Sequence, residues 1–194
     1  MAQQRDTQQR KARLSALDWA DAALAAIAEG GLAAVAVEPL ATRLGTTKGS
    51  FYWHFANREA LIEAALARWA DTATEAAITE IDSEPGPAAR IRRLFIEATV
   101  SAIDDPLEVS LLATASHPQV AAALRRVTER RVDYVTRLFA DLGFPEQEAR
   151  RRGLLAYSVY LGHSQLGHAA PSVLPEGDEL RRYLEAALDA LTRP

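Results

Sequence analysis

The stretch VEPLATRLGTTKGSFYWHF, residues 37–55, decides the fold that this sequence predicts. It contains two short segments with helical spacing, and Gly45 between them permits a tight turn. The apolar face of the first segment consists of Leu40, Ala41 and Leu44. Phe51 and Phe55 stand four residues apart, so they share one face of a helix and can pin the second segment to a core. The pattern predicts a helix-turn-helix, whose second helix enters the major groove of DNA.

The opposite face of the second segment is polar, and Thr47 is expected to be its N-cap. The candidate DNA-contacting residues on it are Thr46, Thr47, Lys48, Gly49, Ser50, Tyr52 and His54. Hydroxyls and backbone N–H groups at the start of a helix are good phosphate ligands. Two of these residues have alternative roles, since Tyr52 can cap the core and His54 can be a packed surface imidazole. Trp53 is assigned to structure.

The first segment departs from the usual pattern in two ways. Ala36 stands where a hydroxyl side chain commonly caps the helix, and Pro39 falls in its first turn, where proline is tolerated. Glu38 is an acid close to the expected phosphates. It either accepts a hydrogen bond from a cytosine amino group or points away from DNA, and the second interpretation is favoured.

Helical spacing continues through the rest of the chain, and no alternating run demands a sheet. The other expected helices span residues 14–30, 57–81, 88–103, 107–116, 118–142, 145–169 and 176–192. The apolar face expected for the first of them consists of Leu14, Leu17, Leu24 and Ile27. The sequence therefore predicts an all-α protein of nine helices in two domains. A flexible basic arm, residues 1–13, precedes a helix-turn-helix head, residues 14–58, and a helical body, residues 59–194.

The amino-acid composition narrows the classes of function that this protein can have. The net charge is −4, with seven Lys/Arg against five Asp/Glu in residues 1–58 and fifteen against twenty-one in the remainder, so the basic end is the head. No cysteine is present, and the histidines His117, His163 and His168 are too scattered for a metal site. The paired arginines of the body, among them Arg130-Arg131, are expected on solvated faces. No stretch approaches the roughly 18 apolar residues of a membrane span, so a cytoplasmic protein is expected.

An enzyme is not expected. Ser50 and His54 lie one helical turn apart, as a nucleophile and a base might, but no acid is placed to orient the histidine and no oxyanion site is visible. No cofactor site is expected either.

Residues 14–61 resemble the tetracycline-repressor (TetR) family, most closely in LGTTKGSFYWHFANREAL, residues 44–61. The resemblance implies a homodimeric transcriptional regulator, a repressor relieved by a small-molecule effector, that binds a palindromic operator. By position, Thr47 and Ser50 would bind phosphate, with Tyr52 and His54 also at the DNA backbone. Lys48 and Gly49 would lie nearest the base edges. Arg58 would clamp a phosphate from the start of the fourth helix.

The resemblance also implies that the body binds the effector and that its two last helices form the dimer. Their apolar stripes are Leu154, Leu155, Tyr157, Leu161 and Leu166 on one helix, and Leu180, Leu184, Ala187, Leu188 and Leu191 on the other. The candidate effector-lining residues are Trp69, Phe95, His117, Tyr134, Tyr157, Tyr160 and His163, all of which can equally be core. The alternative function is a helical ligand- or partner-binding protein whose head no longer reads DNA.

Overall fold

The computed structural model describes residues 14–193, and every regular element in this range is helical. The α-helices are α1 (Ala16–Gly30), α2 (Val37–Arg43), α3 (Lys48–Tyr52), α4 (Arg58–Ala70), α5 (Ala76–Asp82), α6 (Pro87–Asp104), α7 (Pro106–Ala113), α8 (Pro118–Asp141), α9 (Glu146–Ala169) and α10 (Gly177–Thr192). A π-helical turn (Asp71–Glu75) joins α4 to α5 without a break, so the described part of the chain forms the nine expected helices. The predicted all-α fold class is confirmed.

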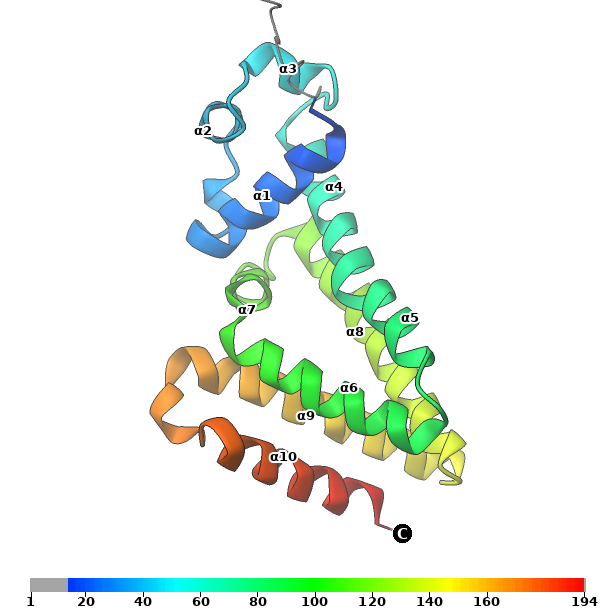
Figure 1. The fold of residues 1–194 in the computed structure, drawn as a ribbon. Coiled ribbons are helices and arrows are strands. Elements are labelled where there is room, and N and C mark those ends of the chain that lie inside the picture. Colours follow the sequence, from blue (N-terminus) through cyan, green and yellow to red (C-terminus); the bar gives the residue numbers. More distant parts are fainter. Residues whose placement is uncertain (1–13, 194) are drawn as a thin grey trace, which may run out of the picture.

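Figure 1 shows α1, α2 and α3 together at one end of the molecule. The continuous helix from α4 to α5 leaves that end and packs along α8. In the body, α6 and α9 lie side by side, and α10 lies against α6 at the end farthest from α3. The basic arm expected at residues 1–13 lies outside the described residues.

Helix α1 has a complete start signal. The Ser15 hydroxyl accepts a hydrogen bond from the backbone N–H of Asp18, and the Asp18 carboxylate accepts one from the backbone N–H of Ser15. The face that α1 buries matches the expected one in part, because Ile27 is fully buried and Leu24 packs against the core, whereas Leu17 is 56% exposed. Trp19 and the alanines of α1 supply most of the buried face, and the leucine spacing did not indicate them.

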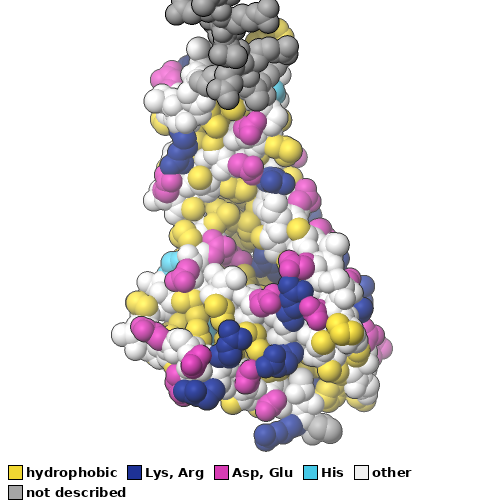
Figure 2. All heavy atoms as spheres, viewed as in Figure 1, with side chains coloured by type: hydrophobic (Ala, Val, Ile, Leu, Met, Phe, Trp, Pro, Cys, Tyr) yellow, Lys and Arg dark blue, Asp and Glu magenta, His cyan; other side chains and the backbone are white. Residues whose placement is uncertain are grey.

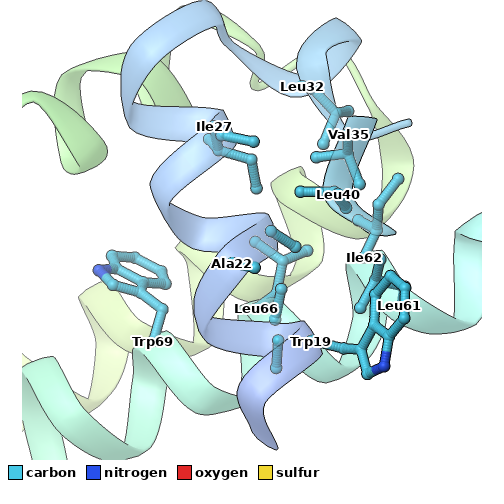
Figure 3. Packing of buried hydrophobic residues seen from close by; sticks show 14 of the residues in the cluster. Trp19, Ala22, Ile27, Leu32, Val35, Leu40, Leu61, Ile62, Leu66 and Trp69 are labelled. Carbon is cyan, nitrogen blue, oxygen red and sulfur yellow. The ribbon is translucent and has the colours of Figure 1, made fainter. Parts of the chain in front are cut away.

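Two hydrophobic clusters build the interior. The first joins α1, α2 and α3 to α4, and Figure 3 shows Trp19, Leu61 and Leu66 within it. It extends into the body through Leu111 of α7 and Val120 of α8. The second cluster joins α5, α6, α8, α9 and α10. The domain boundary expected at residue 58 stays a prediction. Helix α4, which begins at this residue, packs in the same cluster as the helices of the head.

The surface carries charges of both signs, and Figure 2 shows them interspersed over the visible face of the body. Among residues 14–193, no helix has the length and apolar content that crossing a membrane demands.

Candidate functional sites

The turn between α2 and α3 is closed by backbone hydrogen bonds. The Gly45 N–H donates to the carbonyl of Thr42 at 3.0 Å, and the Thr46 N–H donates to that of Ala41 at 2.9 Å. This paired arrangement needs a residue with positive φ just beyond the helix, and Gly45 has a φ of 61°. The glycine therefore sets the angle at which α3 leaves α2.

Helix α3 is held from behind by two aromatic residues. Phe51 is fully buried and Phe55 is 7% exposed, as their spacing predicts. The Phe51 ring meets the edge of Trp19 with 5.4 Å between ring centroids, and it lies 5.6 Å from the Phe55 ring. A helix of only five residues has little stability of its own, so these contacts keep it helical.

The predicted DNA-contacting residues lie on the other side of α3, toward solvent. Thr47, Lys48, Gly49 and Tyr52 are exposed, whereas Thr46, Ser50 and His54 are partly exposed. Thr47 occupies the N-cap position as predicted, but its side chain makes no capping hydrogen bond. The surface on which the DNA-binding hypothesis depends is thus exposed and helical.

Trp53 is 79% exposed, so its assignment to structure is wrong. Helix α3 buries the face that contains Phe51 and Phe55, and a residue halfway between them along the chain points away from that face. The position of Trp53 between the two phenylalanines was the sequence signal that could have predicted its exposure. Trp53 joins the candidate interface as a flat apolar ring with one N–H donor.

Glu38 forms an ion pair with Lys48, and 2.9 Å separates the Lys48 Nζ from the Glu38 Oε1. The carboxylate raises the pKa of Lys48 above its ordinary value, and the ammonium lowers that of Glu38. Neither sequence interpretation of Glu38 included this contact. The acid instead holds the cation that was expected nearest the bases, and both side chains are well exposed.

Arg58 is tied to backbone carbonyls. Its Nε donates to the Val35 carbonyl and its Nη2 to the Leu32 carbonyl, both at 2.6 Å. These bonds connect the start of α4 to the segment between α1 and α2. The phosphate clamp stays a prediction, and the two carbonyl contacts add a bracing role that no sequence pattern indicated.

In the body, a cavity of about 90 Å³ lies between α5, α6, α8 and α9. Four of the predicted effector-lining residues surround it, namely Phe95, Tyr134, Tyr157 and Tyr160. Three others do not line it. Trp69 lies beneath the guanidinium of Arg131, His117 precedes α8, and the His163 ring faces Tyr183 of α10.

Arg131 projects into this region, and its expected place on a solvated face is wrong. Its Nη1 donates to both carboxylate oxygens of Glu108, at 3.0 and 2.9 Å, and Glu108 is 3% exposed. The Tyr160 hydroxyl donates to the same carboxylate at 2.5 Å. Burial opposes the charge on Arg131, but Glu108 outweighs it and raises the pKa of the guanidinium. Arg131 can be buried because Glu108 of α7 places a carboxylate beside it. The spacing of residues along the sequence does not show that these two side chains meet.

The cavity touches the π-helical turn of the long helix. Thr74 lies in that turn and lines the cavity. Arg131 donates to the Thr74 hydroxyl at 3.0 Å and to the Ala73 carbonyl at 3.3 Å. Turns of this kind concentrate at functional sites, because they interrupt the regular hydrogen-bond ladder. One arginine thus connects the cavity wall to the helix that leads to the head.

Comparison with known proteins matches residues 20–65 to the model for bacterial regulatory proteins, tetR family. The search of curated proteins found no match.

Solved structures of similar fold cover nearly the whole chain. A transcriptional regulator from Rhodococcus sp. Rha1 is 23% identical with a TM-score of 0.71, covering 92% of this chain and 94% of its own. A TetR-family regulator from Mesorhizobium loti MAFF303099 is 20% identical with a TM-score of 0.68, covering 91% and 94%. A regulator from Saccharomonospora viridis, solved in complex with choline, is 17% identical with a TM-score of 0.70, covering 90% and 95%. At these identities the likeness shows the fold.

Proposed function

We propose that this chain, whose residues 20–65 match the model for bacterial regulatory proteins of the tetR family, belongs to that family and represses transcription from a palindromic operator as a homodimer. A small molecule bound in the body releases it from DNA. The observation that carries the proposal is the exposed polar face of α3, which Phe51 and Phe55 hold in place from the core side. The Saccharomonospora viridis regulator of similar fold, solved in complex with choline, supports a small-molecule ligand.

In this proposal the hydroxyls of Thr47 and Ser50 bind phosphate, and Tyr52, Trp53 and His54 lie along the DNA backbone. Lys48 and Gly49 lie nearest the base edges. DNA competes with Glu38 for the Lys48 ammonium, because the two oppositely charged groups are in contact in the free protein. Glu38 therefore weakens binding to all sequences and limits how far Lys48 can reach.

The test begins by selecting duplexes from a random library with the wild-type protein. Lys48→Ala is expected to reduce the preference for the selected duplex over a scrambled one by about tenfold, because a base-edge donor is lost. Glu38→Gln is expected to tighten binding to both duplexes several-fold, because the competing carboxylate is gone. Fluorescence anisotropy at several salt concentrations measures both effects.

The matched control is Arg43→Ala, which removes a cation of α2 that pairs with Glu29 on α1. It should leave the preference for the selected duplex unchanged. An unchanged preference in Lys48→Ala would contradict the base-reading role of this residue. Selection that yields no enriched sequence would favour the alternative of a head that no longer reads DNA.

We place the dimer interface on α9 and α10. Leu154, Leu155 and Leu166 of the predicted α9 stripe are exposed and remain candidates, whereas the predicted stripe of α10 faces its own chain. Leu184, Leu188 and Leu191 are buried in the second core cluster of their own chain. Gly153 and Gly167 also face inward, since an added Cβ would meet Thr136 and Ile103 at 2.6 Å. The large apolar residues of α9 and α10 left exposed are Leu154, Leu155, Leu166 and Tyr183.

Leu154→Asp combined with Leu155→Asp is expected to weaken the dimer by about 100-fold or more, because each protomer loses two apolar contacts and gains two charges. Light scattering during size-exclusion chromatography measures the mass at several protein concentrations. Leu112→Asp on α7 is the control, since Leu112 is 40% exposed and lies outside α9 and α10. A double variant that stays dimeric at low concentration would refute this interface.

Release from DNA follows from the path that links the cavity to the head. A ligand that displaces Arg131 alters its bonds to Thr74 and to the Ala73 carbonyl. The helix containing these residues begins at Arg58, whose bonds to Leu32 and Val35 make the head follow its movement. A tilt of this helix changes the distance between the two α3 helices of a dimer, which must match about 34–36 Å on DNA.

A further inference from the structure

The cavity in the body has a mostly apolar wall with one charged side chain, Arg131, among its lining residues. An unpaired guanidinium there would select an anionic ligand. Arg131 is not unpaired, however. Its Nη1 binds Glu108, its Nε binds Thr74, and its Nη2 binds the Ala73 carbonyl.

The charges of this pair also cancel. Arg131 and Glu108 have side chains 13% and 4% exposed, so water screens them poorly. A carboxylate ligand would have to compete with Glu108 for the same nitrogen, and it would add a second buried negative charge. An ammonium ligand would bring a net positive charge into the same poorly solvated region. The wall therefore disfavours both ions.

Thr99 of α6 supplies the second observation. It is 1% exposed and lines the cavity, yet its hydroxyl has no hydrogen-bond partner within residues 14–193. A buried hydroxyl without a partner is unfavourable, because it has given up its bonds to water, so a ligand that offers a hydrogen-bonding group recovers this loss.

We propose that the cavity takes an uncharged, mainly apolar molecule that makes one hydrogen bond to Thr99. The inference rests on the proposed function in treating this cavity as the effector site. It adds the chemical class of the effector. The cavity disfavours ionic ligands because the opposite charges of Arg131 and Glu108 already neutralise each other.

Three probes with one ring and different charges test the class: benzyl alcohol, benzoate and benzylammonium. The probes are limited to one ring, because the cavity of about 90 Å³ is smaller than the apolar cavity of about 150 Å³ that admits benzene, and binding requires its wall to widen. Benzyl alcohol is expected to bind the dimer at least about tenfold more tightly than either ion, measured by calorimetry and by the rise in Tm at about 10 mM ligand, above the millimolar Kd expected for so few atoms. Benzoate or benzylammonium binding as tightly as the alcohol, or no probe raising Tm, would overturn the inference.

Variants locate the contacts. Thr99→Val should weaken the binding of benzyl alcohol about three- to tenfold and leave the binding of toluene unchanged, because only the alcohol can form a hydrogen bond with the Thr99 hydroxyl. Thr136→Val is the matched control, since its hydroxyl is also buried and unpartnered within the described range but lies outside the cavity. Glu108→Gln should gain benzoate binding, because Arg131 is then uncompensated. Equal loss of alcohol and toluene in Thr99→Val would refute the hydrogen bond.

Repeating the DNA titration with benzyl alcohol separates the two proposals. If the probes bind in the expected order but DNA affinity does not change, the ligand class is supported and the effector role of the cavity is refuted. If DNA affinity falls as well, both are supported.

Discussion

Arg131→Met is expected to lower the free energy of unfolding by about 3–5 kcal/mol at neutral pH, the usual cost of leaving a buried charge without its partner. The charge left behind is Glu108, which is 3% exposed. Methionine keeps most of the length of the arginine stem, so the loss reports the charge more than the packing. Urea unfolding followed by circular dichroism measures it.

Arg130→Met is the control, because Arg130 pairs with Glu75 where both side chains are over a third exposed, and such pairs contribute about 0–1 kcal/mol. Equal effects of the two variants would contradict the buried pair.

Phe51→Ala is expected to cost about 3–5 kcal/mol, because a fully buried ring leaves a cavity against Trp19 and Phe55. We expect Phe51→Ala to reduce the affinity for DNA more than it reduces the helix content of the protein. The five residues of α3 lose their anchor, whereas the second core cluster contains no residue of the head. DNA affinity is expected to fall by about 100-fold or more while most of the far-ultraviolet circular dichroism remains.

Trp53→Ala is the matched control for stability. Trp53 is adjacent to the same helix but 79% exposed, and such surface changes usually stay within about 0.5 kcal/mol. A Phe51→Ala protein as stable as Trp53→Ala, or one that keeps full DNA affinity, would show that Phe51 does not anchor α3.

Local spacing was sufficient for much of the fold and for the candidate DNA interface. Proline and glycine breaks marked the ends of the helices, and the four-residue interval between Phe51 and Phe55 identified the buried face of α3. Trp19 was missed, because leucines were weighed above the alanines that actually pack in α1. Trp53 was misassigned as a large aromatic residue, although its spacing from the phenylalanines places it on the exposed side.

The body shows where spacing fails. Four of its aromatic residues do line the cavity, but the polar groups that define its chemistry are Thr99, Glu108 and Arg131. A threonine inside a helix has no distinguishing sequence pattern. Glu108 and Arg131 lie 23 residues apart on different helices, so their contact depends on how α7 packs against α8. Tertiary packing, which no single stretch of sequence encodes, decides that site.

The π-helical turn at Asp71–Glu75 is a joint at which the long helix can bend. Below the joint, α5 stays packed in the second core cluster with α6, while above it α4 belongs to the first. Helix α8 contributes to both clusters, so bending at the joint moves α4 along α8 while α5 keeps its packing. In the dimer that we propose, we expect a chain shortened by one residue within the turn to accept a narrower range of operator spacings.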